Sequence, residues 1–238
     1  MVEDNGAEDA GRPVGRRLVL GLIGLAGIGV ALGSRANSAL TAVSANDPTG
    51  LTGLIPGSSR FRFYSVAGRV DTVDPSAYEL TIGGAVDKPR TFTYQQLADL
   101  PQTTITRDVQ CVTGWRVPDV AWQGVLLSDL LDRVGVRGGA RAVHFGSSDG
   151  IYTESLTMDQ AMRPDVLIAT ALDGEAVSHD HGGPVRLYVA PMYFYKSLKW
   201  LNSITVADRI TPGYWEERGY DTDAWVGESN GRDDDPIF

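Results

Sequence analysis

The sequence predicts an α+β domain built from mixed β-sheets and short helices. Two observations support this fold class. Segments with strand patterns outnumber those with helical patterns, and the helical segments are short and do not alternate with strands as in a doubly wound sheet. The chain has 238 residues, of which 42% are hydrophobic. This share is ordinary for a packed protein, so most of the chain should surround a core.

Apolar runs and apolar–polar alternation mark the candidate strands. These are residues 61–66, 78–86, 103–109, 140–145, 166–172, 185–189 and 200–206. The segments 166–172 and 185–189 are apolar enough to be central strands of a sheet. No internal repeat is present, so the strands should belong to one domain.

Three short helices are predicted from their start and stop signals. In a capping box, a threonine and a glutamine three residues later each satisfy a free backbone N–H, and such boxes begin at Thr93 and Thr157. Leucines at helical spacing predict another helix over residues 124–134, which Gly135 would end.

The first 45 residues have the pattern of an export signal. Arg16 and Arg17 precede a short, glycine-rich apolar run over residues 18–33. Paired arginines before such a run are typical of a twin-arginine signal, and the run is short for a membrane span, which needs about 20 apolar residues. The alternative is an ordinary N-terminal anchor helix. The twin-arginine route carries folded proteins, often because a cofactor is inserted before export.

The rest of the chain divides by composition. Residues 46–59 predict a linker, residues 60–227 the folded domain, and residues 228–238 an acidic tail. The formal net charge is -9, and lysine and arginine form no long block. Because phosphate backbones need a basic face, we expect no nucleic-acid partner.

Cys111 is the only cysteine, so it cannot form a disulfide within the chain. It follows the predicted strand 103–109 and precedes a Gly-Trp turn, a position where sites are often built. A thiolate is a soft metal ligand. The alternative is that Cys111 is a small buried hydrophobic residue.

Three later segments carry groups that can bind an anion: residues 150–156, 180–186 and 193–201. Arg186 with Lys196 or Lys199 could hold a phosphate, and the glycines beside His181 would let the backbone approach a ligand closely.

Together with Cys111, these segments resemble the sulfite oxidase superfamily of molybdopterin-dependent oxidoreductases. The resemblance covers roughly residues 60–227 and is carried by Cys-Val-x-Gly-Trp, Asp-His-Gly-x-Pro-Val-Arg and Lys-Ser-x-Lys-Trp-Leu. It implies the sulfite-oxidase-type fold and a molybdenum-molybdopterin cofactor, in which one pyranopterin dithiolene and a protein cysteine hold the metal.

The resemblance also implies roles for particular residues. Cys111 would be the metal ligand, and Tyr152 would match an active-site tyrosine near the metal. The residues expected to contact the pterin or its phosphate are Tyr64, Ser65, Ser147, His181, Arg186, Lys196, Ser197, Leu198 and Lys199. Arg186 could instead pair with a surface carboxylate, and His181 could cap a turn. Tyr152 could be an ordinary strand aromatic, and Lys196 a solvated lysine. Trp115, Trp122 and Trp200 are expected in the core, and His144 and His179 are expected to be structural.

Two departures from the family pattern bear on the substrate. The Arg-Asn-His segment of sulfite oxidases is missing at residues 64–65, so an arginine cluster for sulfite cannot be assembled. Phe194 stands where the family has glycine, which could narrow the pocket.

We therefore expect an exported enzyme that transfers an oxygen atom, reducing an S-oxide or N-oxide. It would be similar to the compact bacterial members, which include periplasmic methionine sulfoxide reductases. It would act as a monomeric catalytic subunit on a small molecule, with a separate membrane haem protein or cytochrome as redox partner. The alternatives are a sulfite dehydrogenase, or a cofactor-free binding domain anchored in the membrane by residues 18–33.

Overall fold

The structure is a computed structural model that describes residues 61, 64–113 and 115–228. The export signal, the linker and almost all of the acidic tail lie outside these residues, so those assignments stay predictions. The predicted strand over residues 61–66 is wrong where it can be checked, because residues 64–66 have no strand hydrogen bonding.

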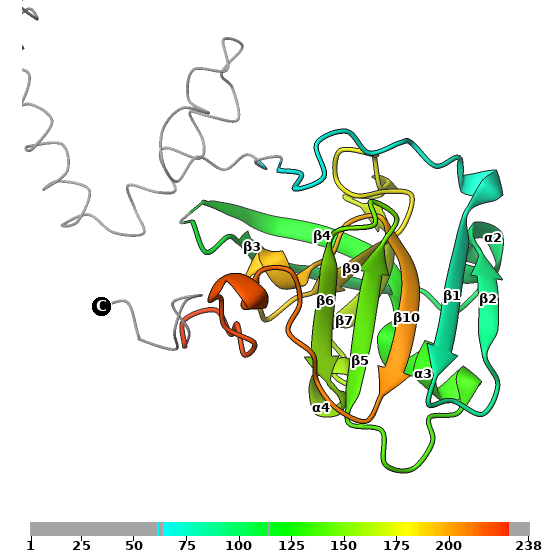
Figure 1. Ribbon diagram of the computed structural model, residues 1–238. Helices are drawn as coiled ribbons and strands as arrows, with labels where there is room; N and C mark the ends of the chain where they lie inside the picture. Colours follow the sequence, from blue (N-terminus) through cyan, green and yellow to red (C-terminus); the bar gives the residue numbers. More distant parts are fainter. Residues whose placement is uncertain (1–60, 62–63, 114, 229–238) are drawn as a thin grey trace, which may run out of the picture. The chain divides into compact units, whose positions relative to one another are not determined.

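Two β-sheets form the framework of the described residues (Figure 1). The first sheet has the order β2 (Arg90–Thr93), β1 (Glu79–Gly84), β10 (Leu201–Ala207), β5 (Ala142–Ser147), β6 (Thr153–Thr157). The second has the order β3 (Thr103–Gln110), β4 (Arg116–Leu126), β7 (Val166–Leu172), β8 (Glu175–Ala176), with β9 (Arg186–Val189) also paired to β7. The β1–β10 pair is parallel and the other pairs are antiparallel, so mixed sheets are confirmed.

The helices are short, as predicted. They are α2 (Tyr94–Ala98), α3 (Leu127–Val134), α4 (Met158–Ala161), and the 3₁₀ turns Pro75–Ala77, Phe194–Lys196 and Glu216–Arg218. Both capping boxes are confirmed: the hydroxyls of Thr93 and Thr157 accept from the backbone N–H of Gln96 and Gln160. Within the described part of the chain, no helix has the length and apolar character needed to cross a membrane.

The predicted helix over residues 124–134 begins three residues later than expected. Residues 124–126 belong to β4, where Gly124 pairs with Ala169 of β7. A Cβ on Gly124 would lie 2.1 Å from the carbonyl oxygen of Ile168. The backbones of β4 and β7 are therefore too close at this point for any residue other than glycine. Tertiary pairing therefore extends the strand into a segment whose pattern is helical.

The core lies between the two sheets and against α3. Its members come from both sheets, such as Ile82 and Ile204 from one and Ile168 from the other, all almost completely buried. A smaller cluster around Trp122 and Tyr188 covers the opposite face of the second sheet. Successive residues of β7 therefore point into different clusters, which explains its continuous apolar run.

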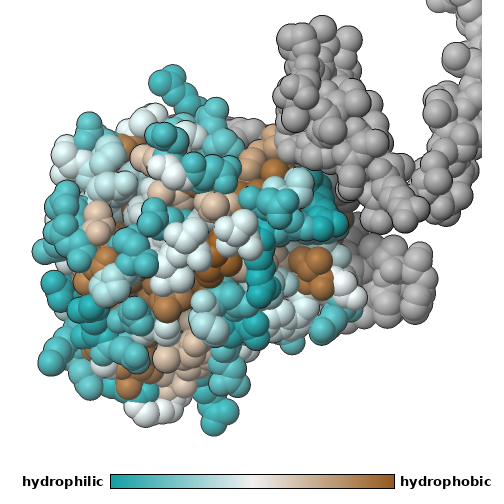
Figure 2. All heavy atoms as spheres, turned by 180° about the vertical axis from the view of Figure 1, so that it is seen from behind, coloured by the Kyte–Doolittle hydropathy of each residue, from teal (hydrophilic) through white to brown (hydrophobic). Residues whose placement is uncertain are grey.

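The surface has no comparable concentration of apolar groups on the face drawn in Figure 2, where apolar residues form small separate groups among hydrophilic ones. Figure 1 shows β4 passing behind β5, β6 and β10 and extending beyond them. Cys111 directly follows β3 in the connection to β4.

Candidate active site

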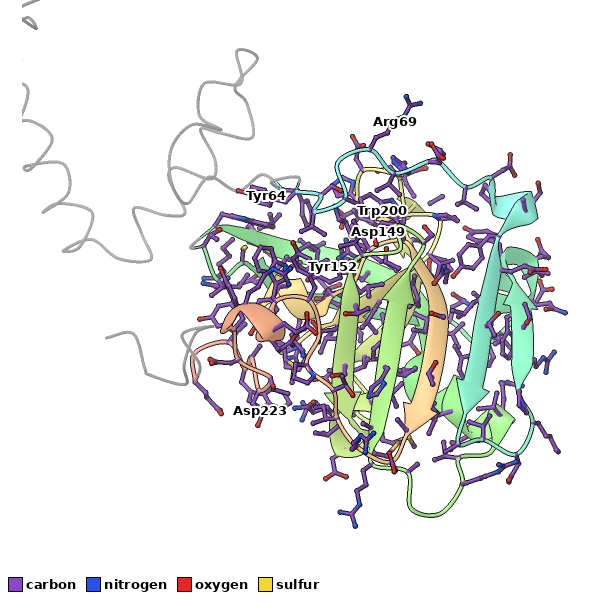
Figure 3. The ribbon with its side chains drawn as sticks, viewed as in Figure 1. Tyr64, Arg69, Asp149, Tyr152, Trp200 and Asp223 are labelled. Atoms are coloured by element: carbon purple, nitrogen blue, oxygen red, sulfur yellow. The ribbon has the colours of Figure 1, made fainter. Side chains whose placement is uncertain are left out.

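Loops from both sheets surround a cavity of about 430 Å³. The β3–β4 turn, the β5–β6 loop, the β8–β9 loop, the β9–β10 connection and residues 64–66 all contribute to its wall. Figure 3 shows Tyr64, Asp149, Tyr152 and Trp200 gathered near one end of the first sheet, and all four line this cavity. Segments far apart in the sequence therefore converge on one place.

Cys111 lies in the turn that follows β3, and its side chain lines the cavity. Its backbone N–H donates to the carbonyl of Trp115 at 2.9 Å, which closes the turn. The sulfur is 3.3 Å from the hydroxyl of Thr113. Across the described residues, no three His, Cys, Asp or Glu side chains converge as a metal site. A metal at this sulfur would therefore need most of its ligands from another molecule.

Arg186 is the most deeply buried cation of the cavity wall, with 1% of its surface exposed. Its guanidinium donates to the carbonyls of His181 and Ser197, both at 2.5 Å, and lies over the ring of Phe194. Among the described residues no carboxylate forms an ion pair with it, and burial lowers its pKa to about 9. A buried cation held only by neutral groups is costly, and it is suited to an anionic ligand.

Lys199 adds a second positive charge to the same wall. Its ammonium donates to the carbonyl of Tyr64 and lies over the ring of Trp200. Burial, with repulsion from Arg186, lowers its pKa to about 8. Burial and Arg186 also lower the pKa of His181, whose ring contacts the hydroxyl of Ser178 at 2.9 Å. Arg186, Lys199 and His181 are therefore neighbouring basic groups, and Arg186 makes protonation of the other two less favourable.

Tyr152 lies in the β5–β6 loop, where the carboxylate of Asp149 accepts hydrogen bonds from the backbone N–H of Ile151 and Tyr152. The Tyr152 hydroxyl donates to the carbonyl of Tyr195 at 2.6 Å, and its ring stacks on Tyr214. Burial raises the pKa of the phenol well above its usual value. The hydroxyl therefore stays protonated, and its single O–H is held by the Tyr195 carbonyl.

Residues 67–215 match the oxidoreductase molybdopterin binding domain family. The chain belongs to this family. It is therefore a molybdopterin-dependent oxidoreductase of the sulfite oxidase superfamily, and its cofactor is molybdenum-molybdopterin.

Curated relatives support this membership. The uncharacterized oxidoreductase YuiH of Bacillus subtilis (strain 168) is 34% identical over 147 residues, which cover 62% of this chain and 74% of that protein. A sulfite oxidase of Arabidopsis thaliana is 31% identical, covering 60% of this chain and 45% of that protein. The protein-methionine-sulfoxide reductase catalytic subunit MsrP of Ralstonia nicotianae is 31% identical, covering 60% and 48%. The chain spans about half the length of the last two.

A solved structure confirms the fold class. The sulfane dehydrogenase SoxCD of Paracoccus pantotrophus superposes with a TM-score of 0.54 at 26% identity, covering 58% of this chain and 40% of that chain.

The cavity fits the cofactor of the family. A molybdopterin carries a phosphate, and Arg186 and Lys199 supply fixed positive charge on the wall. Two buried polar atoms on the same wall, the hydroxyl of Ser65 and the indole N–H of Trp115, have no hydrogen-bond partner within the described residues. Buried polar groups are normally paired, so these atoms indicate a ligand with polar edges.

The structure brings most of the predicted site residues together. Those that line the cavity are Tyr64, Ser65, Cys111, Tyr152, His181, Arg186, Ser197 and Lys199. Ser147 is set back from it, and its hydroxyl accepts from the backbone N–H of Asp149 at 3.2 Å. Leu198 is fully buried in the core, where its carbonyl accepts from Leu187. These two residues shape the loops instead of lining the cavity.

Lys196 requires a correction. It was predicted to contact the cofactor, but its side chain is fully buried behind the wall, where its ammonium donates to Glu154 and Glu216. Two carboxylates neutralise this lysine, so its charge is directed away from the cavity.

Sequence reasoning missed part of the cavity wall. Trp115 and Trp200 are buried as predicted, but both also line the cavity, whereas Trp122 is wholly in the core. Phe194 lines the cavity beside Phe61, with ring centroids 5.9 Å apart. The substitution of phenylalanine for the usual glycine was the sequence signal for this aromatic wall.

Proposed function

We propose that this oxidoreductase reduces a small neutral S-oxide or N-oxide by oxygen-atom transfer. The observation that carries the proposal is the neutralisation of Lys196 by Glu154 and Glu216. With Lys196 withdrawn, the described cavity wall retains the cations Arg186 and Lys199, which we assign to the cofactor. A dianion such as sulfite needs further fixed positive charge, while a neutral oxide does not.

The lining close to Cys111 favours the same class of substrate. Phe61, Trp115 and Phe194 form an aromatic group in which neighbouring ring centroids are about 6 Å apart. Aromatic rings make favourable contacts with the sulfur of a thioether. Asp149 and Asp180 also line the cavity and would repel an anionic substrate.

The cofactor supplies oxygen-atom and two-electron transfer when it is bound. The residues of the chain would then have separable tasks. Cys111 would hold the metal, Arg186 and Lys199 would bind the phosphate, and Tyr152 would form the wall near the reacting oxygen. The aromatic residues would exclude water from the reacting centre.

We further propose that the protein is exported by the twin-arginine route and receives electrons from a separate membrane haem protein or small cytochrome. Arg16 and Arg17 support the first part. The likeness to MsrP, which is a catalytic subunit, supports the second.

The substrate is tested by assaying molybdenum-loaded protein in both directions. We expect consumption of methionine sulfoxide with reduced benzyl viologen, with kcat/KM at least about tenfold above that for sulfite oxidation with ferricyanide, a difference of about 1.4 kcal/mol. Faster turnover of sulfite would establish a sulfite dehydrogenase instead. Protein without molybdenum after expression in a molybdenum-competent host would favour the cofactor-free binding domain.

A further inference from the structure

A cluster of three charged side chains lies directly behind the cavity wall. The reaction described above does not use it. It consists of Glu154, Lys196 and Glu216, which are at most 3% exposed. Each is close in sequence to a residue of the wall, because Tyr152, Tyr195 and Trp215 all line the cavity. We call these three charged residues the buried triad.

The Lys196 ammonium binds only one of the two oxygens of each carboxylate in the triad. The Lys196 ammonium uses its three N–H donors on Glu154, on Glu216 at 2.5 Å and on the carbonyl of Ser155 at 2.9 Å. One oxygen of each carboxylate is thereby bound. The other oxygen of Glu154 and of Glu216 is buried and has no partner within the described residues.

A single added proton would account for the unpartnered oxygens and would also remove the net charge of the triad. Two carboxylates and one ammonium leave a net negative charge away from water, and an uncompensated buried charge costs several kcal/mol. A proton on one carboxyl cancels the charge and turns one unpartnered oxygen into a donor. Glu154 and Glu216 lie beside one another, because both bind the same Lys196 ammonium.

The surroundings favour the protonated state. Burial raises the pKa of Glu154 to about 8, with Lys196 opposing this shift and Glu216 adding to it. Burial lowers the pKa of Lys196, but the two carboxylates outweigh it, so the pKa of Lys196 is raised and the ammonium stays charged. The other titratable neighbours, Tyr152 and Tyr195, have raised pKa values because of burial and these carboxylates.

We propose that Glu154, held beside the second carboxylate of the triad, keeps one proton at neutral pH and delivers it to the cavity during turnover. This rests on the proposed function. Reducing an S-oxide breaks its S–O bond and consumes two electrons and two protons, which yields a thioether and water. The redox partner supplies the electrons, Glu154 supplies one proton, and solvent supplies the other and then reloads Glu154. Tyr152 lies between the two places, because it lines the cavity and its hydroxyl donates to the carbonyl of Tyr195, the residue before Lys196.

The held proton is detected by infrared difference spectroscopy on the full-length, cofactor-loaded protein. On raising the pH from about 6 to 9, we expect loss of the C=O stretch of one protonated buried carboxyl, with a midpoint near pH 8. Glu154→Gln and Glu216→Gln should each abolish this band. Glu217→Gln is the matched control, since Glu217 is exposed and outside the triad, and it should leave the band unchanged. A wild-type protein without the band, or a band that persists in both triad variants, would overturn the proposal.

Delivery of the proton is tested by kinetics. In the wild type, kcat/KM for methionine sulfoxide should decline above about pH 8. In whichever triad variant folds, kcat should fall about tenfold or more and this pH limb should vanish, since positioned proton transfer contributes 10²–10⁴-fold in typical enzymes. Unchanged kcat and an unchanged limb would show that the proton is not delivered. If the infrared band is present but the protein does not reduce methionine sulfoxide, the proposed function is refuted, while the proton held by the triad is not.

Discussion

Two lysines three residues apart show how far a residue's role depends on its distant neighbours. Lys196 and Lys199 occur in one motif and have the same ordinary chemistry, yet one is neutralised behind the cavity wall and the other lines it. The partners of Lys196 lie 42 and 20 residues away in sequence. The motif could predict an anion-binding loop, but only the packed structure could show which lysine serves it.

The lowered pKa of Lys199 predicts a pH dependence of stability. Because its folded pKa of about 8 is below the unfolded value of about 10.5, the unfolded chain binds more protons between these values. The free energy of unfolding of cofactor-free protein should therefore rise with pH from about 8 to 10.

The measurement is urea denaturation of the cofactor-free protein across that pH range. Lys199→Met should be more stable than wild type at pH 7, with a smaller rise at higher pH. The control is Lys88→Met, at an exposed position between β1 and β2, which should follow the wild-type curve. Identical pH slopes for wild type and Lys199→Met would contradict the placement of Lys199 in the wall.

At the scale of elements, the sequence could predict strands whose pattern agrees with their burial. The predicted strand 166–172 coincides with β7, because both faces of this strand are buried and its run is continuously apolar. The long strand β4 was missed, since it contains Pro118 and charged residues. The structure accommodates them at a register shift against β3, where Asp119 has a φ of 53°.

Close pairing of β4 with β7 makes Gly124 sensitive to substitution. Gly124→Ala should lower the free energy of unfolding by about 1–3 kcal/mol, the usual cost of overpacking, because the added Cβ would meet the backbone of Ile168. Urea denaturation measures this change. Gly138→Ala, where nothing lies within 4 Å of the added Cβ, should change stability by less than about 0.5 kcal/mol. Equal stability of the two variants would be inconsistent with this strand pairing.

At the scale of the whole molecule, the site exists because two sheets share one core and send their connecting loops to one cavity. The sequence motifs could predict which loops take part, since cysteine, histidine, arginine and lysine mark them. They could not predict the aromatic lining from Phe61 and Trp115, because an aromatic residue that closes a core and one that lines a cavity have the same local pattern.

Export is a further property of the whole molecule. Replacing both Arg16 and Arg17 by lysine should retain the folded protein in the cytoplasm, because the twin-arginine route requires the arginine pair. Fractionation and immunoblotting of cells expressing each form would measure this. A periplasmic double mutant would contradict the export route while leaving the assignment of the active site intact.

The central claim is that the sulfur of Cys111 binds the molybdenum of a cofactor seated in the cavity. Molybdenum K-edge X-ray absorption of the wild type and of Cys111→Ser tests it most directly, because the spectrum counts sulfur ligands. We predict that the variant loses one molybdenum–sulfur contribution and its turnover of methionine sulfoxide. The same sulfur coordination in both proteins would contradict the claim.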